Sequence, residues 1–228
     1  MTRNLIKLLP HRSDARLAAL ITTQILPGLP EIKSILDIGC GDGIVGELIS
    51  KDCDYRGIDL SNAAIYEQNQ EDSRIIYSKP ENLKQTLCDS NKTDATLMLD
   101  VLEHTRKFTE LFELALQKTK RYSIVSLPNE LFILDRLRLL LGKEHPAHSL
   151  DLVKLPEGFK HQYLINIAKA RELLCNTAEQ QNFALSEEWL RPLIAKSSLI
   201  QPGLKIMRLL TNEQLWSMGS IFVFKKKN

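Results

Sequence analysis

The chain has 228 residues, of which 43% are hydrophobic and 25% are charged, and its formal net charge of +2 gives no indication of a nucleic-acid partner. The four cysteines are scattered without a C-x-x-C pair, so we expect no disulfide framework and no structural zinc, and we expect a cytoplasmic location. No apolar run approaches the roughly 20 residues of a membrane span, and the first residues are too polar for a signal peptide.

The first predicted element is an amphipathic helix at residues 13–26, within an N-terminal helical extension expected to span 1–29. Ser13 is a suitable N-cap for this helix. Leu17 and Leu20 fall on one face of it, which predicts that this face packs against the rest of the protein.

A strand predicted at 33–38 runs into a glycine-rich turn in the sequence SILDIGCGDG. Asp37 stands at the end of this strand, where a buried strand would usually carry another apolar residue. Gly39, Gly41 and Gly43 follow at alternate positions and allow a ligand to lie directly against the backbone. The segment therefore predicts a ligand site, and the acid favours a cationic group over a phosphate.

The turn also fits the dinucleotide pattern G-x-G-x-x-G through Gly41, Gly43 and Gly46. In that register, however, Gly39 and Asp37 occupy strand positions that should be apolar. A carboxylate there would repel a pyrophosphate, whereas it suits a ligand with an ammonium group and an adenosine. S-adenosylmethionine is such a ligand, and an NAD-linked oxidoreductase remains the less favoured alternative.

Beyond the turn, strand-like and helix-like segments alternate, which predicts an α/β fold with a parallel, doubly wound sheet. Ligands bind such sheets at the carboxyl ends of the strands, and Asp37, Asp59 and Asp100 fall at such ends. The predicted strands are 55–60, 73–77, 94–99 and 121–127, and the predicted helices are 43–51, 61–70, 80–88 and 105–119.

After Pro128 the pattern changes to a leucine-rich helix at 129–141 and a loop-like stretch at 142–163. The segment 128–165 is longer than a minimal connection, so we interpret it as a substrate lid insertion. The helix is expected to pack against the domain with its arginines extending to water. The alternatives are that it covers the active site, pairs with a second subunit or touches a membrane surface. The last predicted elements are a helix at 165–181 and strands at 183–190 and 219–226.

The loop-like stretch contains His145, His148 and His161. The first two form an H-x-x-H pair, but a metal site would need further ligands on a firm scaffold. A loop that contains Pro146 offers neither, so no metal site is predicted.

Three segments together resemble one family. The run ILDIGCGDG resembles the first motif of class I S-adenosylmethionine-dependent methyltransferases, residues 55–61 look like the family's second strand, and LMLDVLEH at 97–104 is similar to the "DVLEH" signature of its small-molecule branch. The resemblance covers roughly residues 30–130. It implies a single domain over 1–228 with a seven-stranded, mostly parallel, Rossmann-like sheet, helices on both faces and an antiparallel C-terminal hairpin.

The resemblance also implies a cofactor site. Asp37 would orient the methionine ammonium and Asp59 would accept hydrogen bonds from both ribose hydroxyls; for both acids, capping of the local turn or helix is the alternative. Cys40 is expected to be a small packing residue, because no activating base is near it in sequence. The expected cofactor-binding residues are Asp37, Gly39, Cys40, Gly41, Gly43, Asp59, Leu60, Glu81, Asn82, Asp100 and Val101.

The adenine end departs from the family pattern. Lys79 stands where the family has an acid that accepts from the adenine amino group, and Pro80 has no N–H to donate. We therefore expect adenine recognition to shift to Glu81 or Asn82, or to be weakened. This departure leaves open a catalytically inactive cofactor-binding sensor or partner subunit.

The expected activity is methyl transfer to an oxygen, nitrogen or carbon nucleophile of a small molecule, by a monomer or a homodimer. The candidates on the acceptor side are His104, His161 and Tyr163, which would orient the acceptor or act as a base, with structural roles as the alternative. A sulfonium is already activated, so alignment supplies much of the catalysis. The sequence indicates neither the acceptor nor the atom that is methylated.

Overall fold

The computed structural model describes residues 13–60, 73–154, 160–192 and 213–227. The strands are β1 (Ser34–Ile38), β2 (Asp54–Leu60), β3 (Ile75–Ser78), β4 (Thr93–Leu99), β5 (Thr119–Pro128), β6 (Phe183–Pro192) and β7 (Ser217–Lys226). They form one sheet in the order β3-β2-β1-β4-β5-β7-β6. β1 to β5 are parallel, and β7 is antiparallel to both of its neighbours.

This sheet confirms the predicted fold, including the antiparallel C-terminal pair of strands, and each predicted strand is present. Its order reverses beside β1, where the chain first builds outward to β3 and then returns to β4. A doubly wound sheet opens a crevice for a ligand at this reversal. The helix predicted at 61–70 lies outside the described residues.

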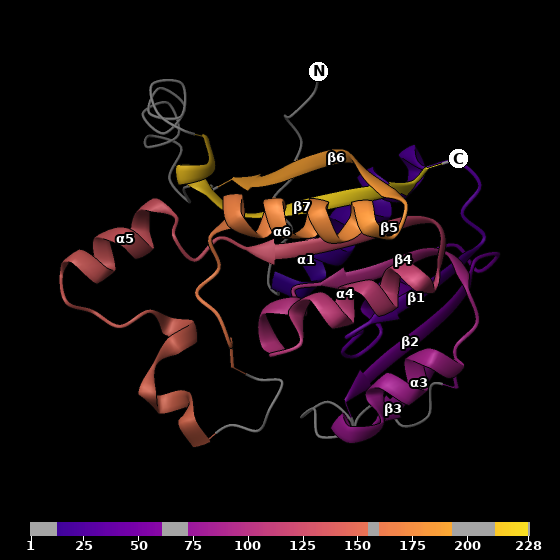
Figure 1. Ribbon diagram of the computed structural model, residues 1–228, viewed down its shortest axis with the longest axis horizontal. Coiled ribbons are helices and arrows are strands. Elements are labelled where there is room, and N and C mark those ends of the chain that lie inside the picture. The colour runs from indigo at the N-terminus through magenta and orange to yellow at the C-terminus, as the bar shows by residue number, and fades with distance from the viewer. Residues whose placement is uncertain (1–12, 61–72, 155–159, 193–212, 228) are drawn as a thin grey trace.

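Helices cover both faces of the sheet (Figure 1). One face carries the confirmed helices α3 (Leu83–Asp89), α4 (Phe108–Gln117) and α6 (Ile167–Gln180), and the other carries α1 (Ser13–Leu20) and α2 (Ile44–Leu48). Because successive side chains of a strand point to opposite faces, Leu36 of β1 joins the core under the first set of helices. Its neighbour Ile35 joins the core under α1 and α2.

The helical segment predicted at 13–26 is present but is not α-helical throughout. α1 ends at Leu20, a π-helical turn spans Ile21–Ile25, and a 3-10 turn follows at Leu26–Gly28. The Thr22 hydroxyl donates to the Ala18 carbonyl at 2.9 Å, and such bonding to the preceding turn bends a helix. The next turn contains a proline, which cannot continue the α-helical hydrogen bonding.

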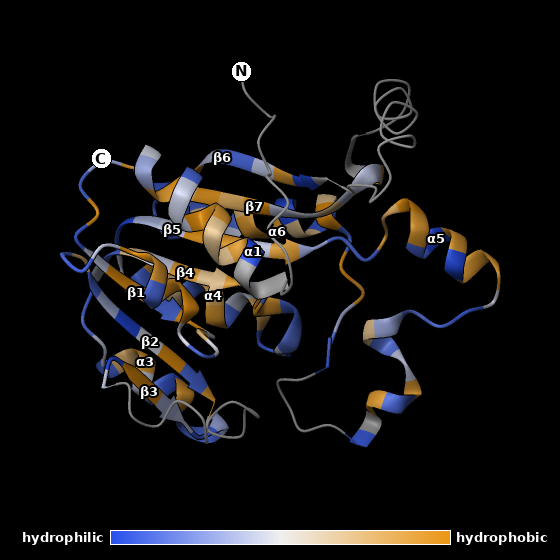
Figure 2. Cartoon of the chain, turned by 180° about the vertical axis from the view of Figure 1, so that it is seen from behind, coloured by the Kyte–Doolittle hydropathy of each residue, from blue (hydrophilic) through white to orange (hydrophobic). Residues whose placement is uncertain are grey.

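The leucine-rich helix is the clearest correction. α5 spans Ile133–Leu140, within the predicted 129–141, but Asp135 is its only buried residue. Leu134 and Leu140 are 47% and 81% exposed, so the expectation of a packed helix is wrong. The physical reason is its position: α5 extends beyond the carboxyl end of β5, where no second layer of the described residues covers it, and Figure 2 colours much of this helix hydrophobic.

Short 3-10 turns at Pro146–His148 and Leu150–Lys154 interrupt the stretch that was predicted to be loop-like. Together with α5 they form an arm beside the carboxyl ends of β4 and β5 (Figure 1). None of the helices in the described part of the chain combines the length and the apolarity that crossing a bilayer requires.

Candidate functional site

The glycine turn, residues 39–43, follows β1 with an unusual backbone. Gly39, Gly41 and Gly43 have φ values of 75°, 58° and 75°, in the left-handed region that favours glycine. A Cβ at Gly39 would overlap the side chain of Val101, and one at Gly43 would lie 2.6 Å from Cδ1 of Ile75. The turn therefore needs glycine for its conformation and for its close approach to the turn after β4.

Asp37 lies beneath this turn as the penultimate residue of β1, with 1% of its surface exposed. The hydroxyl of Tyr55, on β2, donates to its Oδ2 at 2.9 Å. Burial raises the pKa of Asp37 to about 7, against the lowering effect of the Tyr55 hydrogen bond. A nearby cation would favour the ionised carboxylate, so this acid is well suited to respond to an ammonium group above it.

Asp59, the penultimate residue of β2, joins the glycine turn to the end of its own strand. Its Oδ2 accepts a hydrogen bond from Gly41 N–H and its Oδ1 accepts one from Leu60 N–H, both at 2.5 Å. Burial raises its pKa, and the two backbone hydrogen bonds oppose that rise. A carboxylate oxygen can accept more than one hydrogen bond, so this acid has capacity for further donors.

Cys40 is buried inside the glycine turn. Burial and the nearby carboxylates of Asp37 and Asp59 raise the pKa of its thiol, so it is protonated at neutral pH. A Cβ at Gly57 would lie 2.6 Å from its Sγ. These surroundings support the packing interpretation rather than a nucleophile.

The strand-three side of the turn is open to solvent. Glu81 and Asn82 lie in an exposed 3-10 turn, and Lys79 is the residue that caps it. Tyr77 of β3 stands opposite Asp59 and donates through its hydroxyl to the Gly41 carbonyl at 3.4 Å. Sequence reasoning missed Tyr77, although an aromatic residue at a strand end beside the predicted site was a usable signal.

Asp100 follows β4 with a φ of 54°. The Ser126 hydroxyl donates to its Oδ1 at 2.6 Å, and Nη1 of Arg191 lies 2.7 and 2.8 Å from its two oxygens. Arg191 comes from β6, at the far edge of the sheet, and no motif in the sequence indicated it. These contacts hold the turn after β4 against β5 and β6.

Glu103 and His104 close that turn as part of a 3-10 turn. Glu103 is 1% exposed and neither of its carboxylate oxygens has a hydrogen-bond partner among the described residues. Burial, with a contribution from Asp100, raises the pKa of Glu103 well above its usual range. His104 Nδ1 is also buried without a partner there, and burial together with His161 lowers the His104 pKa to about 4.

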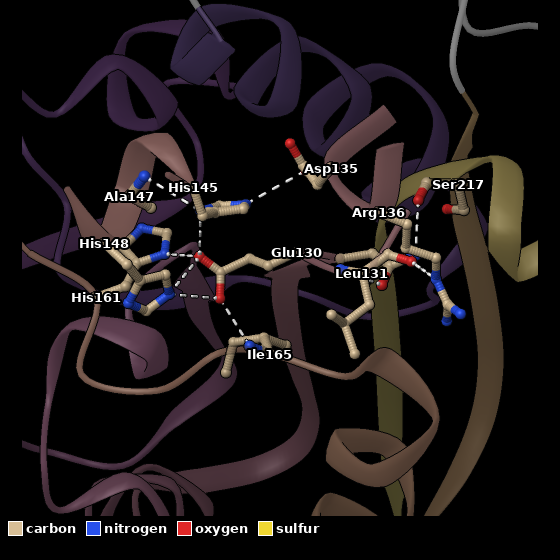
Figure 3. Close-up of polar contacts among 11 residues, drawn as sticks. Glu130, Leu131, Asp135, Arg136, His145, Ala147, His148, His161, Ile165 and Ser217 are labelled. Carbon is tan, nitrogen blue, oxygen red and sulfur yellow. Dashed lines mark hydrogen bonds and ion pairs between the residues drawn. The ribbon is translucent and has the colours of Figure 1, made fainter. Parts of the chain in front are cut away.

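Glu130, just after β5, lies within hydrogen-bond distance of two histidines, His148 and His161 (Figure 3). His161 Nδ1 lies 2.6 Å from its Oε1, and His148 Nε2 lies 3.2 Å from each oxygen. The Ile165 N–H donates to Oε2 at 2.6 Å. Although burial acts to raise it, these hydrogen bonds hold the pKa of Glu130 below its usual value.

His145 extends the same network toward α5. Its Nε2 lies 3.3 Å from an oxygen of Asp135, and its Nδ1 accepts the Ala147 N–H at 3.2 Å. Four of the chain's five histidines thus share one region with three buried acids. We call this group the histidine cluster, and it consists of Glu103, His104, Glu130, Asp135, His145, His148 and His161.

The structure brings together two of the three acceptor-side candidates. The rings of His104 and His161 lie 4.6 Å apart between centroids, edge to face. Tyr163 is 42% exposed, and its hydroxyl donates to the Arg106 carbonyl at 2.7 Å, away from the cluster's hydrogen bonds. Sequence reasoning missed Glu130, and the closeness of three histidines along the chain was the one signal that could have indicated the cluster.

Comparisons with known proteins agree with this fold. A family model described as a methyltransferase domain matches residues 10–183. An S-adenosylmethionine-dependent methyltransferase from Archaeoglobus fulgidus superposes with a TM-score of 0.61 at 16% identity, covering 94% of this chain and 95% of that one. No curated protein sequence matches the chain.

Two further solved structures were determined with S-adenosylhomocysteine. Magnesium protoporphyrin IX methyltransferase from Synechocystis PCC 6803 has a TM-score of 0.53 at 15% identity, with 94% of this chain and 86% of that chain covered. A plantazolicin methyltransferase in complex with a triazolic desmethylPZN analogue has a TM-score of 0.52 at 17% identity, with 94% of this chain and 83% of that chain covered. At such identities the likeness shows the fold alone. The family match and the fold agree: this chain belongs to the methyltransferase domain family and has the fold of an S-adenosylmethionine-dependent methyltransferase.

Proposed function

We propose that the protein transfers a methyl group from S-adenosylmethionine to an oxygen, nitrogen or carbon atom of a small molecule. The observation that carries this proposal is the glycine turn over the buried Asp37, with the Asp59 carboxylate at its side. The turn is a cradle that a Cβ at Gly39 or Gly43 would fill. A ligand with an ammonium group and a ribose, and without phosphate, matches these neighbours.

The cofactor would supply a methyl group on an activated sulfonium. In our assignment, Asp37 and the glycine turn bind the methionine part, and Asp59 with Leu60 binds the ribose. Glu81 and Asn82 are the candidates for the adenine, and Asp100 and Val101 line the side toward β4. Cys40 packs within the turn.

On the acceptor side, His161 is our candidate for the base. Its Nδ1 donates to Oε1 of Glu130, 2.6 Å away, so the lone pair of the ring is on Nε2. The low pKa of His104 keeps it neutral but makes it a weak base, so we assign it to orienting the acceptor. Tyr163 is the third candidate, and its use requires release from the Arg106 carbonyl.

We also propose that residues 1–228 form one methyltransferase domain, with 1–29 as a helical extension and 128–165 as a substrate lid. The position of the arm beside the carboxyl ends of β4 and β5 supports the lid. The four cysteines are free, which suits a reducing cytoplasm. The proposed acceptor is a small molecule and not a nucleic acid. A peripheral membrane contact through the exposed leucines of α5 is compatible with this activity. The protein could act as a monomer or as a homodimer.

Calorimetric titration with S-adenosylmethionine and with S-adenosylhomocysteine tests the proposal. We expect binding of both, and Asp59→Ala should weaken it about tenfold or more through loss of charge-assisted hydrogen bonds. Asp54→Ala is the matched control, because this acid lies exposed at the opposite end of the same strand. Absence of binding at millimolar cofactor would overturn the proposal.

One alternative has an observation in its favour. Lys79 and Pro80 depart from the family's adenine pattern and lie exposed beside the turn, which fits a cofactor-binding sensor or partner subunit without transferase activity. Tight cofactor binding without turnover on any small-molecule acceptor would favour this alternative. An NAD-linked oxidoreductase is less favoured, and binding of NADH at micromolar concentration, seen by its fluorescence, would restore it.

A further inference from the structure

The histidine cluster contains three side chains whose ligand atoms converge. Glu103, His104 and His161 each offer one ligand atom, and these atoms all lie within 4.8 Å of one another. Two come from the turn after β4, and the third, His161, comes from the segment between the arm and α6. Side chains so far apart in sequence meet here because the arm folds back on that turn, where Gln162 N–H donates to the Glu103 carbonyl at 2.7 Å.

Three side-chain atoms of this group have no hydrogen-bond partner among the described residues. Glu103 is 1% exposed, and both of its oxygens are without a hydrogen bond among the described residues, as is Nδ1 of His104. An isolated buried carboxylate is costly unless it is protonated, paired or bound to a metal. Asp100 and Glu130 are further acids nearby, and Arg191 pairs with Asp100. A cation bound by the two oxygens of Glu103 would give them the partner that they lack.

The two imidazoles are oriented as metal ligands usually are. In metal sites, a histidine commonly donates its second ring N–H to a carboxylate or a backbone carbonyl, which directs the other nitrogen to the ion. His161 donates through Nδ1 to the Glu130 carboxylate at 2.6 Å, so its Nε2 carries the lone pair. The His104 ring forms a hydrogen bond with the backbone of Lys160, and its Nδ1 is left over.

A neighbouring group, Glu130 with His145 and His148, has the same spacing of its ligand atoms. Its atoms are already engaged, however. Glu130 accepts from His161, His148 and Ile165 N–H, and His145 uses one nitrogen toward Asp135 and the other toward Ala147 N–H (Figure 3). The polar atoms of this second group therefore have hydrogen-bond partners without an ion. Through Glu130, the second group holds His161 of the first group in place.

We propose that Glu103, His104 and His161 bind one divalent transition-metal ion, and that Glu130 is the positioning residue for His161. Two imidazoles and one carboxylate suit Zn²⁺, Co²⁺, Mn²⁺ or Fe²⁺ better than Ca²⁺ or Mg²⁺, which prefer oxygen ligands. Three protein ligands leave coordination positions open. If the proposed methyl transfer holds, an oxygen of the acceptor would bind there and lose its proton to water more readily, and His161 would then hold the ion instead of acting as the base; only this last point rests on the proposed function.

Titration of the chelator-treated full-length protein with Zn²⁺ by calorimetry, and with Co²⁺ by visible absorption, tests the site. We expect one equivalent of each ion to bind. Glu130→Gln should weaken binding by roughly 10- to 100-fold, as changes in the outer shell of a metal do. Glu103→Gln and His161→Gln should weaken it further, and the Co²⁺ absorption bands should change in each.

His148→Gln is the matched control, because it removes a histidine of the supporting group but no proposed ligand. Its Zn²⁺ affinity should stay within a few-fold of the parent protein. Strong loss in His148→Gln without loss in Glu103→Gln would overturn the assignment in favour of the neighbouring group. Absence of binding of both ions at millimolar concentration would overturn it altogether, and thermal unfolding checks that each variant is folded. Because the readout is ion binding, failure here is distinguishable from failure of cofactor binding.

Discussion

The two halves of the carboxyl edge of the sheet are built in different ways. The glycine turn is a run of consecutive residues whose backbone conformation and close packing on Val101 make the site. The histidine cluster is assembled from two segments, the turn after β4 and the arm after β5, through side-chain contacts to Glu130. The comparison teaches that a site made by backbone shape can be recognised in a sequence, whereas a site made by side chains from distant segments requires the tertiary structure.

The largest expected effect is on the glycine turn. Gly39→Val places a branched side chain at φ 75° and against Val101, so we expect loss of measurable S-adenosylhomocysteine binding by calorimetry. Gly142→Ala is the control, since Gly142 also has a positive φ, of 68°, but nothing lies near its Cβ position. It should cost only about 1–2 kcal/mol of stability. Normal binding by Gly39→Val would show that the turn is not the cradle.

The next effect concerns Asp37, whose pKa burial raises to about 7 in the folded protein. The folded state then binds a proton that the unfolded state has released, so stability falls as the pH rises from about 4 to about 7. The total loss should approach about 4 kcal/mol, at 1.36 kcal/mol per unit of pKa. Urea unfolding at pH 5 and pH 8 measures the upper part of this fall, about 3 kcal/mol.

Asp37→Asn should abolish this part of the pH dependence and be more stable than the parent at pH 8, while binding the cofactor more weakly. Asp54→Asn, at an exposed acid of β2, should retain the trend of the parent protein. Equal pH profiles for the parent and Asp37→Asn would contradict the assignment.

A smaller effect on stability is expected for a change in the histidine cluster. Glu130→Ala leaves two histidines and the Ile165 N–H without their acceptor and should lower the free energy of unfolding by about 3 kcal/mol, the scale for breaking a buried charged pair. Chemical denaturation measures this value. Glu144→Ala, at an exposed acid of the same arm, is the control.

The same variant sharpens the comparison of the two halves. Because none of the partners of Glu130 belongs to the glycine turn, S-adenosylhomocysteine affinity should change by less than about threefold, as expected for independent sites. A large loss of affinity in Glu130→Ala would mean that the two halves act as one unit.

Most of the fold could be predicted, because apolar periodicity and turn residues are local properties. The alternation of strands and helices predicted the sheet, and the seven strands lie where it placed them. The leucines of α5 were misinterpreted for a physical reason. A helix that is apolar around much of its circumference is buried only if another layer covers it, and no such layer lies over the arm among the residues that the structure describes.

For the candidate site, the sequence by itself determined the glycine turn and placed Asp37 and Asp59 at adjacent strand ends, since parallel strands bring these ends to one edge. Only the tertiary structure decided that Tyr55 bonds Asp37, that Arg191 pairs with Asp100 and that Glu130 gathers the histidines. Each of these contacts joins residues from different strands or from opposite ends of the arm. Such pairings depend on packing between elements, which leaves no periodic trace along the chain.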